Sequence, residues 1–209
     1  MRCPAQAASM VTLSDDAVAE IKHEGESMTT IDLLTLIERH HPETDGLDRE
    51  TLEAYADRLA EERDYAFDAE SFLSAVDDAL TDTNEFDDGL LYRLGDDRIS
   101  VYPQSWHDEL GDSTDAEAYV GFLQDVDGFP AASADTGLGV PERELESVLS
   151  VVGRISRDEA RTVIERQREN GKLVEDADQH RNAGVYRSED AEGLRDVTDH
   201  SEPLHDENA

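Results

Sequence analysis

Acidic residues outnumber basic ones in this chain by so wide a margin that charge limits how it can fold. The 209 residues include 52 Asp and Glu against 18 Lys and Arg, and the formal net charge is −34 at pH 7. A high net charge with few hydrophobic residues usually indicates disorder. Clear helical and strand periodicity along most of the chain instead favours a folded protein adapted to high salt, in which ions screen the repulsion among surface carboxylates.

The basic residues point the same way, because Lys22 and Lys172 are the only lysines and all others are arginines. The composition resembles that of proteins from salt-in halophiles, haloarchaea in particular. In such a protein, overall acidity does not argue against nucleic-acid binding. No stretch approaches the roughly 18 apolar residues of a membrane helix, and the first stretch, MRCPAQAASM, lacks the apolar segment of a secretory signal. We therefore expect a cytoplasmic protein with no membrane contact.

The hydrophobic periodicity changes from helical to strand-like twice, each time in the same order. Residues 29–103 show three helical segments and then a β-hairpin around Gly95, and residues 112–188 show three helical segments and then two strands. We expect an α+β fold, mainly α with small β-hairpins, built as two tandem ααα-ββ units. The halves share order and spacing but not residue identity, so a single domain with interleaved elements is the alternative.

The same patterns divide the chain into segments of different character. These are a peripheral disordered extension at 1–27, a helical unit with a hairpin at 28–111, a second unit at 112–190, and an acidic disordered tail at 191–209. Within the first segment, Met1, Met10 and Met28 are each a candidate natural start. Pro141 is expected in the first turn of a helix, because its ring suits that position.

One stretch departs from the general acidity. In residues 154–187 basic and acidic side chains nearly balance, whereas the rest of the chain is strongly acidic. An anionic partner would approach most easily there. The alternative is that a helix in this stretch pairs its own charges three and four residues apart.

Residues 140–188 contain a connected set of motifs. VPERELESVLSVVG predicts a helix, GRIS a turn and SRDEARTVIERQRENG a second helix, whose final Gly171 leads to the strands KLVED and GVYRS, with ADQHRNA between them. This order resembles a winged helix-turn-helix domain, and the run from SRDEAR to ENGKLV carries most of the resemblance. The resemblance implies that SRDEARTVIERQRENG is the recognition helix and ADQHRNA the wing tip.

The resemblance implies a transcription regulator that binds double-stranded DNA and needs no cofactor. A recognition helix exposes a polar face to the major groove while its other face packs. The expected DNA contacts are Arg157, Arg161, Thr162 and Arg168 on the recognition helix and Gln179, His180, Arg181 and Asn182 in the wing. At about 100° per residue the three arginines form one stripe beside the apolar face. Arg can hold a phosphate or a guanine edge with two hydrogen bonds.

The alternative function is a tandem winged-helix adaptor that binds proteins and makes no nucleic-acid contact. Acidic residues on the same helix favour it, because Glu165 can pair with the arginines while Glu159 and Glu169 would repel phosphates. The shared fold does not decide between the two functions.

The first unit is expected to form a homodimer or bind a protein partner rather than DNA. Its third helical segment, DAESFLSAVDDALTD, contains no basic residue and would repel a duplex. The aromatic residues Tyr92, Tyr102 and Trp106 either form a partner surface or belong to the core, and burial is the more common role of such residues.

We expect neither an enzyme nor a metal site. Neighbours on a helix point about 100° apart, so His40 and His41 cannot readily share a metal. We interpret His107 as a surface or boundary histidine. Cys3 lies in the expected extension, and the segment TGLGVP lacks the Lys-Ser/Thr of a phosphate-binding loop.

Overall fold

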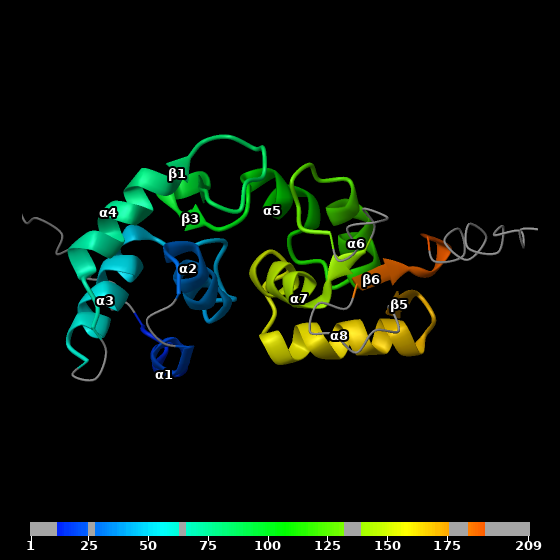
Figure 1. Cartoon of the computed structure of the whole chain (residues 1–209), viewed down its shortest axis with the longest axis horizontal. Helices are drawn as coiled ribbons and strands as arrows, with labels where there is room; N and C mark the ends of the chain where they lie inside the picture. The colour runs from blue at the N-terminus through cyan, green and yellow to red at the C-terminus, as the bar shows by residue number, and fades with distance from the viewer. Residues whose placement is uncertain (1–11, 25–27, 63–65, 132–138, 176–183, 191–209) are drawn as a thin grey trace, which may run out of the picture. The chain divides into compact units, whose positions relative to one another are not determined.

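The structure, a computed structural model, describes residues 12–24, 28–62, 66–131, 139–175 and 184–190 (Figure 1). The chain divides into two compact units, which are described separately below. The N-terminal unit contains residues 1–113 and 147–157, and the C-terminal unit contains residues 114–146 and 158–209. In the described ranges helices predominate and two small three-stranded sheets accompany them, so the α+β fold class is confirmed.

Three of the helices of the N-terminal unit begin at side-chain caps. The helices of this unit are α1 (Asp15–Glu24), α2 (Thr30–Arg39), α3 (Arg49–Ala60), α4 (Ala69–Ala79) and α5 (Gln104–Leu110). Thr29 and Asp32 form a reciprocal capping box at α2, and Asp48 and Asp68 accept backbone N–H groups at the starts of α3 and α4. Such caps satisfy N–H groups that the helix itself leaves unpaired. Helix α5 was not predicted.

The sheet of this unit contains the predicted hairpin and one strand that the sequence did not reveal. Its strands lie in the order β1 (Leu80–Thr81), β2 (Leu91–Arg93) and β3 (Ile99–Ser100). Strands β2 and β3 pair antiparallel, as expected, and β1 adds a parallel edge beside β2. Leu47, between α2 and α3, also pairs antiparallel with Ile99 of β3.

The aromatic residues near the hairpin belong to the core, which confirms the more common of their two expected roles. Tyr92, Tyr102 and Trp106 are all buried. The rings of Tyr102 and Trp106 stack with their centroids 5.1 Å apart, and Phe86 stacks on Trp106 at 5.0 Å. These side chains are therefore not available as a partner surface.

Helix α1 corrects the expectation that residues 1–27 form a disordered extension. Its Ala17, Val18 and Ile21 are buried. The backbone N–H of Ser14 donates to the Tyr55 hydroxyl, which also bonds His41 at 2.8 Å. The prediction of disorder is thus wrong for residues 15–24, while residues 1–11, including Cys3, lie outside the described ranges.

The C-terminal unit places its elements where the sequence predicted three helices and two strands, with one further short strand. They are α6 (Ala116–Gln124), β4 (Val140–Pro141), α7 (Glu142–Val151), α8 (Arg157–Glu169), β5 (Leu173–Glu175) and β6 (Gly184–Arg187), with the C-terminal part of α7 and Arg157 counted in the other unit. The strands lie in the order β4-β6-β5, all antiparallel. Pro141 belongs to β4 and precedes α7, so its predicted place inside the helix is wrong by one residue.

The two units share a local arrangement in which a glycine precedes a residue that pairs with the last strand of the sheet. Gly46 and Gly139 both have positive φ angles, of 67° and 88°. The residue after each glycine pairs with the last strand of its sheet, Leu47 with β3 and Val140 with β6. In each unit the next helix begins two residues later.

Candidate functional site

Helix α8 packs on the side that its periodicity predicted and exposes the other side. Ala160, Val163 and Ile164 are buried. The residues exposed to solvent are Asp158, Glu159, Arg161, Thr162, Glu165, Arg166 and Glu169. This side is therefore polar along its whole length, but it carries more carboxylates than guanidinium groups.

Two of the arginines expected to contact DNA instead join α8 to α7. Arg161 Nε donates to Glu146 Oε1 at 3.1 Å, and Arg168 Nη2 lies 2.8 Å from Glu142 Oε2. Glu142 and Glu146 are four residues apart on α7, about one helical turn, and Arg161 and Arg168 are seven residues apart on α8, about two turns. We call these two pairs the α7–α8 ladder.

The Arg161 rung of the ladder is anchored in the interior. The Glu146 side chain is only 7% exposed, whereas the Arg161 side chain is 46% exposed. A buried carboxylate needs its partner, since an unpaired buried charge is costly. The hydrogen bond to Glu146 raises the pKa of Arg161, so the guanidinium is held charged and in place.

Arg168 is held more completely than Arg161. Besides Glu142, it pairs with Glu175 of β5 at 3.3 Å. Its Nε and Nη2 atoms are buried and meet no acceptor in hydrogen-bonding geometry among the described residues. The Arg168 side chain therefore cannot reach a duplex without leaving these carboxylates.

The remaining expected contacts fall in three different settings. Arg157 lies 3.5 Å from Glu20 of α1 within the N-terminal unit. Thr162 is exposed, and its hydroxyl donates to the backbone carbonyl of Asp158. The wing residues 179–182 lie outside the described ranges. Of the predicted recognition-helix residues, Thr162 alone has an exposed side chain with no ion pair.

Sequence reasoning missed two cations of this unit. Among the described Lys and Arg side chains, Arg143 of α7 and Arg166 of α8 are the two with no ion pair or hydrogen bond to a described residue. Both are exposed. Arg166 lies away from the stripe of arginines beside the apolar face, and that position is what leaves it beyond the reach of the acids of α7.

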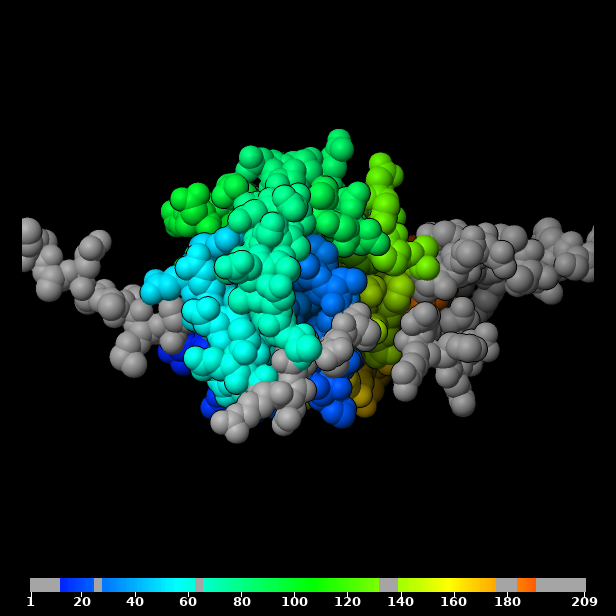
Figure 2. All heavy atoms as spheres, turned by 60° about the vertical axis from the view of Figure 1, so that its left-hand side comes forward, coloured from blue at the N-terminus to red at the C-terminus, as the bar shows by residue number. Residues whose placement is uncertain are grey.

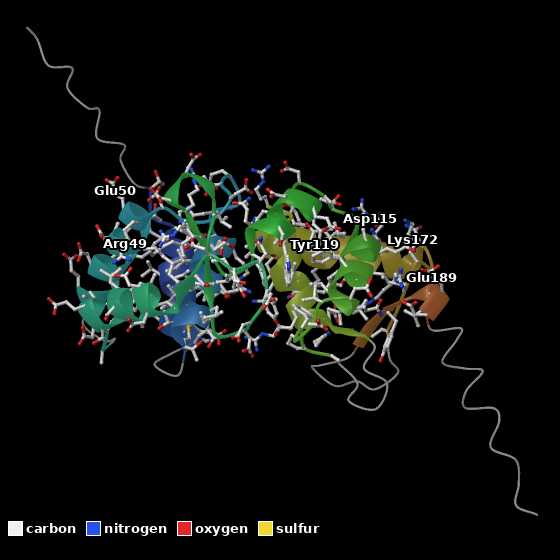
Figure 3. All side chains as sticks on the ribbon, turned by 90° about the horizontal axis from the view of Figure 1, so that it is seen from above. Arg49, Glu50, Asp115, Tyr119, Lys172 and Glu189 are labelled. Carbon is white, nitrogen blue, oxygen red and sulfur yellow. The ribbon has the colours of Figure 1, made fainter. Side chains whose placement is uncertain are left out.

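The C-terminal end of α8 also fixes the start of α6. Gln167 Oε1 accepts the backbone N–H of Glu117 at 2.9 Å, and its Nε2 donates to Asp115 at 3.0 Å. Lys172, just after α8, pairs with Glu117 at 3.0 Å, and Figure 3 shows Asp115 and Lys172 side by side. Gln167 thus supplies the cap that α6 does not obtain from its own N-cap residue.

In the N-terminal unit, α4 occupies the corresponding place in the order of elements. Figure 2 shows its side chains, in turquoise, at the surface of that unit. The exposed residues of α4 are Glu70, Ser71, Ser74, Asp77 and Asp78. None of these residues is basic and three are acidic, so the exposed side of α4 agrees with the expectation that this helix would repel a duplex.

His40, His41 and His107 have structural partners in the described ranges. His40 lies 2.9 Å from Glu20, and His41 bonds Tyr55. His107 is buried, so its interpretation as a surface residue is wrong. Within the described ranges no group of three or more His, Cys, Asp or Glu side chains is arranged to hold a metal ion.

The comparisons with known proteins give no family. No protein-family model, curated protein or solved structure matches the chain. In the part of the chain that the structure describes, no helix is long and apolar enough to span a membrane.

Proposed function

We propose that residues 112–190 form a winged-helix domain that binds double-stranded DNA through the exposed side of α8, in a cytoplasmic transcription regulator of a salt-in halophile. The order of the C-terminal elements supports this proposal. A helix, an edge strand, two helices joined by a short turn and a two-stranded hairpin follow one another, and the edge strand pairs with the last strand. The resemblance in the sequence implies the same order from α7 to β6.

The ladder changes the set of residues that we assign to the duplex. Arg161 and Arg168 hold α8 against α7, so their role is to position the helix. The proposed contacts are Thr162 and Arg166 of α8 together with Arg143 of α7. The observation that carries the assignment is that Arg143 and Arg166 remain exposed without a carboxylate partner on so acidic a protein.

High salt makes so small a set of cations sufficient. Counterion release supplies much of the affinity of basic proteins for DNA and fades as salt rises. At about 1 M salt the Debye length is roughly 3 Å, so only charges in direct contact matter. Guanidinium groups that meet phosphates or guanine edges at close range suit this regime.

Chromatin immunoprecipitation with sequencing in a haloarchaeal host tests the proposal at native salt. We expect discrete peaks for the tagged protein and their loss in the Arg143→Ala/Arg166→Ala variant. The matched control is Arg93→Ala, which removes an exposed arginine of the N-terminal unit and should leave the peaks unchanged. Charge reversal of Arg161 and Arg168 is unsuitable here. It would place a carboxylate against Glu146 and another against Glu142, and the repulsion would unfold the unit.

Peaks that survive the double substitution would contradict the assignment of these arginines to DNA. A flat profile for the unaltered protein would contradict DNA binding altogether.

A second candidate function is a tandem winged-helix adaptor with no nucleic-acid contact. The acidic side of α8 favours it, because Asp158, Glu159, Glu165 and Glu169 are all exposed there and would repel phosphates. The N-terminal unit would then supply a second binding surface or a homodimer contact. Two results together would support this alternative. One is a flat immunoprecipitation profile, and the other is a cellular protein that crosslinks specifically to a photoreactive group placed at Thr162 on α8.

A further inference from the structure

Three polar side chains are buried together in the N-terminal unit. Glu38 of α2, Ser100 of β3 and His107 of α5 are all buried, and Ser100 has no exposed surface. Ser100 Oγ lies 3.0 Å from His107 Nε2, and it accepts the backbone N–H of Tyr102 at 3.1 Å. Glu38 Oε2 accepts the backbone N–H of Val101 at 3.1 Å. We call Glu38, Ser100 and His107 the buried cluster.

The cluster is incompletely paired. Glu38 Oε1 and His107 Nδ1 are buried, and no described residue meets either atom in hydrogen-bonding geometry. Asp45 Oδ1 approaches His107 Nδ1 to 3.8 Å, which is too far for a hydrogen bond. An ionised carboxylate with one bare oxygen in such a place is strongly unfavourable, and the neutral acid is much less so.

We propose that the buried cluster is a proton-sensitive latch, in which Glu38 stays a neutral carboxylic acid while the N-terminal unit is folded and loss of its proton weakens that unit. The latch joins three elements that are distant in the sequence, because Glu38 comes from α2, Ser100 from β3 and His107 from α5.

The number of hydrogens in the cluster supports the neutral form. The Ser100 hydroxyl has one hydrogen to donate and already accepts one from Tyr102. With Glu38 neutral, that hydrogen is free for His107 Nε2, and the imidazole carries its own hydrogen on Nδ1, facing Asp45. With Glu38 ionised, the hydroxyl hydrogen goes to the carboxylate, and the imidazole must carry its hydrogen on Nε2 to bond Ser100. Nδ1 is then a bare acceptor that faces the carboxylate of Asp45.

Burial acts on both titratable members in the direction that the latch needs. Burial raises the pKa of Glu38 to about 7, against the bonds from Ser100 and Val101 that favour the charged form, and Asp45 raises it further. Burial lowers the pKa of His107, against the attraction of Asp45 and Asp108. Both side chains therefore favour their neutral forms in the folded unit.

The charged groups around the cluster belong to each neighbouring segment. The loop before α3 contributes Asp45, and Arg154 pairs with Asp45 at 3.6 Å and also with Asp112. On α1, Glu20 is engaged by His40 and Arg39 of α2. From α4, Asp77 turns to Arg49. Asp45 is thus the carboxylate that faces the cluster, and its charge opposes ionisation of Glu38.

The order Ser100, His107 and Asp45 has the connectivity of a nucleophilic relay, but it does not serve as one in this structure. Ser100 is wholly buried, so no substrate can reach its oxygen.

The sign of the pH dependence follows from the raised pKa of Glu38. The folded unit holds a proton that the unfolded chain releases at the ordinary pKa of 4.5. Stability from this group is fully present below that value and is lost as pH rises to about 7. Over this range the contribution of Glu38 to the folding equilibrium constant should fall by up to about tenfold per pH unit and level off above. His107 acts in the opposite direction below its ordinary pKa of 6.5, because its lowered pKa makes the unfolded chain bind the extra proton.

Denaturant unfolding of the full chain in molar potassium chloride, between about pH 5 and pH 8, tests the latch. Trp106 is the only tryptophan, lies next to His107 and is buried, so its fluorescence reports the N-terminal unit. We expect the folding constant of the unaltered protein, divided by that of Glu38→Gln, to fall over this range, because the amide is neutral at every pH and the other titrating groups cancel in the ratio. The corresponding ratio for Glu70→Gln, which changes an exposed carboxylate of α4, should stay constant. An equal slope in Glu38→Gln and the unaltered protein would overturn the proposal.

Infrared spectroscopy of the folded protein gives an independent measurement should Glu38→Gln fail to fold. Glu38 is a described carboxyl group whose pKa is raised to about 7. A carbonyl band of a protonated carboxyl group should therefore be present near pH 6 and disappear by about pH 8. A folded protein without this band near pH 6 would contradict the latch.

Discussion

Gly139 is a position at which the C-terminal unit has no room for a side chain. Its φ angle is 88°, and a Cβ atom there would lie 2.6 Å from the Tyr186 ring. The residue leads directly into β4, whose Val140 pairs with β6. The backbone conformation and the close ring thus act together to bring the first strand to the edge of the sheet.

Gly139→Ala should destabilise the C-terminal unit by about 2–4 kcal/mol, because the strain of a positive φ angle adds to a steric clash. The matched control is Gly171→Ala, which has a φ angle of 70° but open space around the new Cβ atom. It should cost only about 1 kcal/mol. Thermal unfolding followed by circular dichroism gives both values, and equal losses would show that the clash with Tyr186 is relieved by movement of the ring.

The single residues also show why the structure-based proposal assigns DNA contacts other than those expected from the sequence. Arg157, Arg161 and Arg168 are spaced so that they form one stripe beside the apolar side of α8, and the structure does place all three on that helix. Which of them is available depends on acids of another helix, namely Glu142 and Glu146. Helical spacing within α8 places Arg166 opposite the core, but only the acids of α7 decide that it is left exposed without a partner.

At the scale of elements, the α7–α8 ladder sets how helices α7 and α8 pack. The Arg161 rung reaches a buried carboxylate, whereas most ion pairs on this protein lie in solvent. Exposed pairs contribute little, and a pair with one buried member contributes more because removing its partner leaves a bare charge.

A double-mutant cycle with Glu146→Gln and Arg161→Met should give a coupling free energy of about 1 kcal/mol that persists in molar salt. The control cycle is Asp82→Asn with Arg93→Met, an exposed pair whose coupling should vanish at that salt concentration. Chemical unfolding at low and high salt measures both. Equal salt sensitivity in the two cycles would argue against a structural role for the Glu146 rung.

Elements were predicted well where they start at local signals and poorly where they depend on distant partners. The caps at Thr29, Asp48 and Asp68 lie within three residues of the N–H groups that they bind, so the helices were predictable. The short strands β1 and β4 exist only through pairing with β2 and β6. Strands of two residues are too short to show the alternation of polar and apolar residues by which a strand is predicted.

For the whole molecule, the net charge of −34 predicts a strong dependence of stability on salt. Repulsion among carboxylates destabilises the folded chain at low ionic strength, and molar salt screens it. The melting temperature should rise steadily from about 0.1 M to about 2 M potassium chloride. Sucrose at matched osmolality is the control, and an equal rise in sucrose would attribute the effect to exclusion from the surface rather than to screening.

The sequence by itself determined the acidity, the helical segments that became α2, α3, α4, α6, α7 and α8, the β2–β3 hairpin and the two strands β5 and β6. These depend on composition or on residues a few positions apart, whose interactions are the same in any surrounding. Only the tertiary structure decided that α1 is anchored through Ser14 and Tyr55, that Arg161 is engaged by Glu146, and that Glu38 is buried beside Ser100. Each of these joins residues far apart in the chain, and burial and pairing exist only once the chain has brought them together.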